Sequence, residues 1–415
     1  MNQRLMKRKW QQQRRGVLSL AFLAVAFLVV TLFLYWRRAS AAALPTHNLV
    51  EIYDTAVSEQ VYAPVHLHID PMAGLLLVNF ENDPDEIYIG FEPQLFDDDV
   101  HGQGLIVIAW RVDGRVDVYH QPGLTLDPET YDIAGGGLNE MLERPLHAAY
   151  YRVNEAGVDT YFAFEDAIGR PIEVTIQEKN QRERKPFGLL APMGSAATDP
   201  SALPLVYLHD FYFVRQADTT FSIKVDGQER QPDTLPLPID GTRMTFIRYS
   251  PDPLIATLNP AHDGPLAPLT MVSPTEAQLG DLQFELVDNQ GRPEIAAMRR
   301  AYKERAVSVT FTPPLPHLFS LADGVETNGR FTISADPTVG TVAGTYQMTR
   351  QGDEVRMEMV PDQGWQPNET KRAVRLIYWV ASDFTNWPKT YRWTAVIDLN
   401  QSQPVTMQSG WQRTE

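Results

Sequence analysis

The stretch LIVIAWRVDGRVDVYH, residues 105–120, decides the fold class of this chain. Two apolar-rich runs flank the dipeptide Asp113-Gly114, and a turn dipeptide between such runs is the strongest short-range signal of a β-hairpin. The same arrangement recurs around turns at 169–171, 226–227 and 351–353. We therefore predict a mainly β protein whose hairpins lie in both halves of the chain.

Helical patterns are rare by comparison, and the best one lies at 293–307. This stretch, PEIAAMRRAYKERAV, begins with Pro293 and places Ile295, Met298 and Tyr302 at spacings of three and four. We predict a short helix here.

Length and composition indicate the domain organisation. About 370 residues follow position 48, too many for one ordinary core, so we expect two domains. The absence of a short repeat favours antiparallel sheets that close into sandwiches or lipocalin-like barrels. The predicted segments are a cytoplasmic basic tail (1–16), a transmembrane signal-anchor helix (17–36), a linker (37–48), a first β-rich domain (49–258), a proline-rich linker (259–268) and a second β-rich domain (269–415) that contains the short helix.

Residues 17–36 are predicted to span a membrane once. They contain no charged side chain, and Ser19 and Thr31 are their only polar interruptions. At about 1.5 Å per residue such a helix crosses the roughly 30 Å of a bilayer's hydrocarbon core. Tyr35 and Trp36 end the run, where aromatic rings favour the headgroup region.

Charge predicts the orientation of this helix. Six basic residues precede it and two follow, so the amino terminus is expected in the cytoplasm and the body outside it, in a bacterial envelope. A cleaved signal peptide is the alternative, because Ala39-Ser40-Ala41 has the small-x-small form of a cleavage site. Signal peptides usually have a shorter apolar core, of about 7–15 residues. Both interpretations place the body outside the cytoplasm.

Composition excludes several function classes. Without the eight basic residues of the first 38, the body has 28 basic and 52 acidic residues, a net charge of −24. Such a surface repels phosphate backbones, so we expect no nucleic-acid partner. The chain has no cysteine, which excludes disulfides, thiolate catalysis and cysteine-ligated metal centres. We expect no cofactor.

The run VHLHID presents a weak candidate metal site. On a strand, His66, His68 and Asp70 would share one face, and two imidazoles with a carboxylate are suitable zinc ligands. Same-face neighbours on a strand lie nearly 7 Å apart, however, so the alternative is the wet face of an amphipathic strand.

The most aromatic stretch of the chain is 204–216, and a second unusual segment follows at 243–253. As a regular strand, the first segment places His209 on one face and Asp210 on the other, among apolar neighbours. A charge there is costly unless a cation meets it. Arg248 lies on an apolar face of the second segment and is the natural candidate.

We therefore predict a buried ion pair between Asp210 and Arg248. It is either purely structural or part of a ligand pocket that also uses Tyr212, Tyr249 and His209.

Tryptophan is concentrated near the end of the chain, where five of the eight fall within the last 51 residues. Trp379 and Trp393 lie in strand-like runs and are expected in the core. Trp365 and Trp387 lie in turn-like contexts, so these two are the candidates for exposed rings that stack against a sugar.

Other suggestive loops lack a complete motif. Gly135-Gly136-Gly137 and the stretch 193–197 match neither a phosphate loop nor a hydrolase nucleophile elbow. The acidic run Asp97-Asp98-Asp99 has no recognisable calcium cage. We interpret all three as ordinary loops.

In outline, an anchored pair of β-barrel-like domains resembles the tandem lipocalin-like proteins related to carotenoid hydratases. The resemblance is one of architecture, and it implies a lyase or hydratase activity on an apolar substrate. No catalytic residue is carried over from that family.

Two functional hypotheses follow. In the first, the tethered body is non-catalytic and binds an apolar small molecule or another envelope component. In the second, it is a cofactor-independent lyase or hydratase whose barrel interior is lined by Asp210, Tyr212, Arg248 and His209.

Overall fold

The computed structural model describes residues 52–54, 60–193, 198–236, 238, 241–336, 339–368, 372–380, 382–400 and 404–414. The chain divides into two compact units, Met1–His47 and Asn48–Glu415, and the described residues all belong to the second. The predicted basic tail, transmembrane helix and linker at 1–48 lie outside the described residues. Among those residues, no helix has both the length and the apolar content needed to cross a bilayer.

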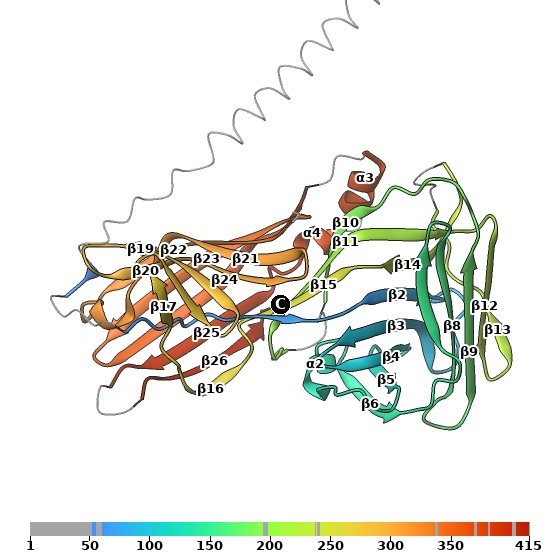
Figure 1. Ribbon diagram of the computed structural model, residues 1–415, viewed down its shortest axis with the longest axis horizontal. Helices are drawn as coiled ribbons and strands as arrows, with labels where there is room; N and C mark the ends of the chain where they lie inside the picture. Colours follow the sequence, from blue (N-terminus) through green and yellow to red (C-terminus); the bar gives the residue numbers. More distant parts are fainter. Residues whose placement is uncertain are drawn as a thin grey trace, which may run out of the picture. The chain divides into compact units, whose positions relative to one another are not determined.

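The described residues form three sheets, so the predicted mainly β fold is confirmed (Figure 1). A ten-stranded sheet has the order β1-β15-β11-β14-β2-β3-β4-β5-β6, with β10 paired to β11. Its strands are β1 Leu67–Asp70, β2 Gly74–Asn79, β3 Tyr88–Asp98, β4 Gly102–Arg111, β5 Val116–His120, β6 Leu138–Glu143, β10 Phe187–Ala191, β11 Leu203–Arg215, β14 Met244–Ser250 and β15 Pro253–Leu258.

A five-stranded sheet has the order β13-β12-β9-β8-β7. It consists of β7 Tyr150–Asn154, β8 Gly157–Glu165, β9 Pro171–Glu178, β12 Thr219–Val225 and β13 Gln228–Arg230. Its alternating strands share one apolar core with β2, β3, β4 and β14, which makes these two sheets a sandwich.

The third sheet has eleven strands in the order β16-β26-β25-β24-β23-β22-β21-β20-β19-β18-β17. Figure 1 shows them in yellow to red. They are β16 His262–Pro265, β17 Thr270–Ser273, β18 Glu276–Leu279, β19 Leu282–Asp288, β20 Pro293–Tyr302, β21 Arg305–Leu315, β22 Glu326–Asp336, β23 Gly340–Gln351, β24 Glu354–Pro367, β25 Tyr391–Asp398 and β26 Thr406–Arg413.

Chain connectivity explains why this third sheet curls into a half-barrel. β16 and β17 lie at opposite edges of the sheet, yet only four residues separate Pro265 from Thr270. Five residue steps reach at most about 18 Å, so the two edges must approach each other. The buried face inside the curl is filled by apolar side chains, among them Phe331, Trp393 and Trp411.

Helices are few and short in the described ranges. They are α2 Pro128–Asp132, α3 Arg372–Val380, α4 Ser382–Asn386 and the 3₁₀ turn η2 Leu318–Ser320. The α2 helix begins at the N-cap Asp127, whose carboxylate accepts from the Glu129 backbone N–H.

The hairpins predicted around turn dipeptides are confirmed. β4 pairs antiparallel with β5, β8 with β9, β12 with β13 and β23 with β24. At the β12–β13 turn, Asp226 and Gly227 both have positive φ, 51° and 72°, as a type I′ turn requires.

The predicted helix at 293–307 is wrong, because these residues form the β20–β21 hairpin. A register shift between Ile295 and Ala297 changes the phase of the strand. Ile295 and Met298 are therefore both buried although three positions separate them. The bulge thus imitates the spacing of a helix.

The stretch 259–268 contains strand β16, which pairs with β26. Strands up to β15 belong to the first two sheets, and strands from β16 onward belong to the third. One apolar core cluster contains side chains from both groups. Trp411 of β26 also donates its indole N–H to the carbonyls of Leu258 (3.0 Å) and Asn259 (2.9 Å).

Exchanging Trp411→Phe should therefore cost about 1–3 kcal/mol of unfolding free energy, because it leaves buried carbonyls without this donor. Trp393→Phe is the matched control, since the Trp393 ring is equally buried but its N–H has no acceptor among the described residues. Urea unfolding of both variants measures the difference. Equal losses would contradict the assigned role of the Trp411 hydrogen bonds.

Candidate functional site

A largely apolar cavity of about 290 Å³ lies against β2, β3 and β4 of the large sheet. Residues of β10 and β11 line it as well, and Phe384 of α4 contributes an aromatic ring. Leu75 and Leu77 of β2, Leu189 of β10 and Leu208 of β11 are among its apolar residues. A concave apolar site with a few polar groups is the usual form of a small-molecule site.

The cavity becomes polar along β2. Leu75, Leu77 and Asn79 of β2 line it because alternate residues of a strand face the same side, and Glu81 in the turn that follows lines it as well. The first two are apolar and the last two polar, so the site has chemically distinct ends.

Arg248 of β14 supplies the cation at the polar end. Its guanidinium lies over the Phe246 ring, with Cζ 5.2 Å from the ring centroid, and donates to Asn79 Oδ1. Its Nε atom is buried and has no acceptor among the described residues. The guanidinium therefore has more donors than the surrounding protein uses.

Burial lowers the pKa of Arg248 to about 10, against the opposing influence of the carboxylates of Glu92, Glu81 and Asp233. The side chain still carries its charge at neutral pH.

Glu92 of β3 is the second ionisable group in the cavity, and this residue is buried, with only 6 % of its surface exposed. Its carboxylate accepts from Gln94 Nε2 (2.9 Å) and Trp110 Nε1 (3.1 Å). Burial raises the pKa of Glu92 although these two hydrogen bonds oppose the shift.

Glu92 and Arg248 do not neutralise each other by contact. β2 lies between their strands, with Leu77 opposite Arg248. In the part of the chain that the structure describes, no ion pair within 4 Å joins the two side chains. An acid and a cation thus line one apolar cavity separately.

The predicted Asp210–Arg248 pair is not formed. Phe213, not Asp210, lies opposite Arg248 in the β11–β14 register. The Asp210 side chain is 41 % exposed and accepts from Arg305 Nη2 at 3.2 Å, while Arg305 Nε donates to Asp252 at 3.0 Å. Asp210 therefore belongs to a separate ion-pair cluster beside the β14–β15 bend.

Of the five predicted ligand-pocket residues, Arg248 lines this cavity and the other four do not. Tyr212 and Tyr249 stack on each other with ring centroids 5.1 Å apart, and Tyr249 is buried in the sandwich core. His209 is also buried, with its ring 6.3 Å from that of Tyr207.

The structure separates the predicted metal ligands His66, His68 and Asp70. His68 Nδ1 lies 3.4 Å from the guanidinium of Arg300, and Asp70 binds His101 at 2.9 Å. Burial and then the Arg300 charge lower the pKa values of both His66 and His68. Within the described ranges, no group of three or more His, Asp or Glu side chains is arranged to hold a metal ion.

The tryptophans proposed for stacking are buried. Trp365 is 0 % and Trp387 8 % exposed, because the backbone N–H of Trp365 bonds the Trp387 carbonyl and the two segments pack together. Neither ring is open to a sugar. Trp393 is buried in β25 as predicted, whereas Trp379 lies on α3, not on a strand, and is 78 % exposed.

The three suggestive loops have structural roles or lie outside the described residues. Gly136 donates its backbone N–H to Gly114 O, so the glycine run packs against the β4–β5 turn. Asp97 and Asp98 end strand β3 and so lie on a strand, not in a loop, and Asp98 accepts from the backbone N–H groups of Val100 and His101, which orders the β3–β4 turn. Residues 194–197 are not described.

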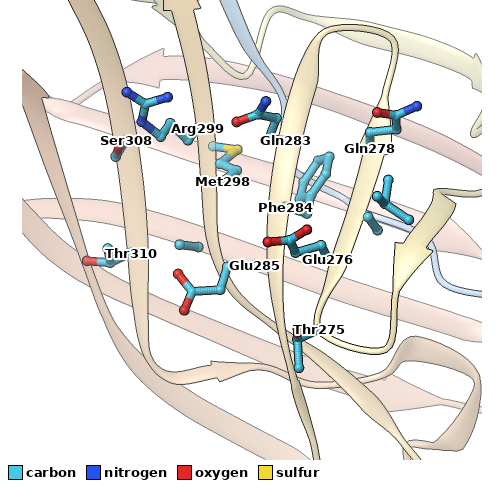
Figure 2. A pocket seen from close by; sticks show the side chains of 13 residues that line it. Thr275, Glu276, Gln278, Gln283, Phe284, Glu285, Met298, Arg299, Ser308 and Thr310 are labelled. Carbon is cyan, nitrogen blue, oxygen red and sulfur yellow. The ribbon is translucent and has the colours of Figure 1, made fainter.

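A larger hollow of about 500 Å³ lies over β18–β21, and Figure 2 shows its mostly polar lining. Glu276 and Glu285 are direct register partners there, and like charges in that position repel. No ion pair joins Arg299 to either glutamate among the described residues. These side chains are exposed, so the buried polar groups of the apolar cavity make it the stronger candidate.

Sequence reasoning missed Glu92. The signal was present in FEPQLF, residues 91–96, where two polar side chains alternate with apolar ones on a strand. When both faces of such a strand are covered, its polar side chains are buried, which is costly unless they serve a purpose.

Comparison of this chain with protein-family models, with curated proteins and with solved structures finds no match.

His101 predicts a pH dependence of stability. Its ring bonds Asp70 at 2.9 Å and Asp98 at 3.1 Å, joining β1 to the β3–β4 hairpin. Burial alone would lower the pKa of His101, but the two carboxylates outweigh it and raise the pKa. The stabilisation is complete below the unfolded-state pKa of about 6.5 and is lost as pH rises through the folded-state value.

Urea unfolding of His101→Gln and of the unaltered protein between pH 6 and 9 tests this expectation. The free-energy difference between them should shrink as pH rises. His147→Gln, at an exposed position, is the control and should show no such trend. A pH-independent difference for His101→Gln would refute the ion-pair assignment.

Proposed function

We propose that the body of this protein is a non-catalytic binding module for an apolar small molecule, held in the cavity between β2–β4 and β10–β11. The observation that carries the proposal is an apolar cavity that contains two separate ionisable side chains, the buried Glu92 and the half-buried Arg248, whose Nε atom is buried. In this proposal the predicted helix at 17–36 holds the body at the outer face of a bacterial membrane.

The chemistry of the cavity supports a small ligand over an envelope protein. Its volume is near the lower end of the range of small-molecule sites, about 300–1,000 Å³. Most of its lining residues belong to strands, and they form a concave site, not an extended flat surface. An envelope component remains the alternative partner for the exposed faces of the body.

A second candidate function is a cofactor-independent lyase or hydratase of tandem lipocalin-like architecture. The observation that favours it is Glu92, whose raised pKa increases its protonated fraction in an apolar site. A carboxylic acid of this kind is suited to donate a proton to a double bond of an apolar substrate. In this version Glu92, in place of Asp210, is the acid.

The chain's lack of cysteine allows a direct test of the cavity. Leu77→Cys places one thiol in its lining, and 1-decanol should slow alkylation of that thiol several-fold in the full-length, membrane-bound protein. Val112→Cys, at a position exposed at the β4–β5 turn, is the control and should react at an unchanged rate. Equal protection at both positions would mean that decanol acts on the reagent or the membrane and not on the cavity.

Glu92→Gln separates the two candidate functions. A binding module should keep its protection at position 77, because the amide retains the shape of the carboxylate and one of its two acceptor oxygens. If the protein is an enzyme, Glu92→Gln should still bind the substrate and protect the thiol at position 77. It should no longer add water to an alkene, a reaction that mass spectrometry follows. No water addition by the unaltered protein to any alkene that protects position 77 would exclude the hydratase version.

A further inference from the structure

The cavity has an amphiphilic lining, and this inference about its ligand rests on the proposed function. Leu75 and Leu77 mark its apolar part along β2, while Asn79 and Glu81 follow at the polar part. Because Arg248 donates to Asn79, its guanidinium also lies at the polar part. A ligand that is apolar throughout would leave this end unmatched.

Arg248 is the group in this cavity with unused hydrogen-bonding capacity. A guanidinium has five N–H donors, and the described protein supplies Arg248 with one acceptor, Asn79 Oδ1. The Nε–H is buried without a partner. Such an unsatisfied cation costs stability in an apolar environment, and a ligand that brings acceptors would recover that cost.

The carboxylates near Arg248 are bound to other donors. Asp233 accepts from the backbone N–H groups of Glu81 and Asn82. Glu92 is held by Gln94 and Trp110, as described above. Glu81 is exposed at the end of the cavity.

These three carboxylates influence Arg248 from a distance but leave its donors free. The raised pKa of Glu92 also lessens its repulsion of an incoming anion.

We infer that the cavity takes an aliphatic carboxylate of medium chain length, with its carboxylate on Arg248 and its chain along Leu77, Leu75 and Leu208. A carboxylate presents two oxygens in the plane that matches a guanidinium fork, and charge-assisted bonds of this kind are roughly twice as strong as neutral ones. An alcohol head satisfies fewer donors, and an ammonium head is repelled. The small volume excludes a large ring system or a two-chain lipid.

Alkylation of Leu77→Cys in the full-length, membrane-bound protein compares three probes of equal chain length: decanoate, 1-decanol and decyltrimethylammonium. Decanoate should protect the thiol at a concentration about tenfold lower than decanol, because it adds a charge-assisted fork. The ammonium should protect least.

Arg248→Met in the Leu77→Cys background should make decanoate and decanol protect the thiol at about the same concentration, because the charge-assisted bond to decanoate is lost. The concentration at which decanol protects should change little. Arg248→Lys keeps the charge without the planar fork and should retain a part of the advantage. If Arg248→Met does not fold, the lysine variant and the three-probe comparison in the unaltered Arg248 background still decide the question.

The outcomes separate the two proposals. Equal protection by decanoate and decanol, or stronger protection by the ammonium, overturns the carboxylate inference and leaves the apolar binding site standing. Protection by none of the three probes overturns the proposed binding function itself. A decanoate advantage that persists in Arg248→Met would assign the carboxylate to another side chain and so overturn the role of Arg248.

Discussion

The backbone pairing of β11 is the constraint on which the described fold depends. Its first half pairs with β15 and its second half with β14, while β10 takes the opposite edge. Pro251 and Pro253 interrupt the line of β14 and β15, because proline cannot donate to the ladder. The ladder breaks there, and the apolar cavity is lined by β11 and by Arg248 of β14 on one side of the break. Arg305 of the third sheet binds Asp210 and Asp252 beside the same break.

Two ionisable groups, Arg248 and Glu92, give the cavity its chemical character. Where stability alone matters, a buried acid and base are best placed in contact or replaced by apolar side chains of similar volume. Here β2 holds Arg248 and Glu92 apart, and Glu92 receives its hydrogen bonds from Gln94 and Trp110. The arrangement leaves donors on Arg248 that the described protein does not use. That surplus is the physical reason for proposing a binding site here.

Local chemistry predicted the hairpins, whereas features that depend on strand register were inaccessible from the sequence. A turn dipeptide and its flanking alternation act within one hairpin, as at β4–β5. The residue that lies opposite Arg248 depends on how β14 pairs with β11, which is distant in the sequence. We predicted Asp210 at this position, but the register of the two strands places Phe213 there. The bulge at Ile295 disguised a strand as a helix. Trp365 was misjudged because the segment that buries it follows later in the chain.

The approach of the two edges of the third sheet, together with the size of its inward side chains, determines how much room its interior leaves for a ligand. The short connection between β16 and β17 forces the third sheet to curl, and a curled sheet has room for a ligand only where its inward side chains are small. Here Phe331, Trp393 and Trp411 fill that interior. Against the large sheet, by contrast, a cavity is left between β11, β14 and β2, and Leu75 and Leu77 of β2 line it. The cavity that we propose as a binding site therefore lies against the large sheet, where ionisable groups line it.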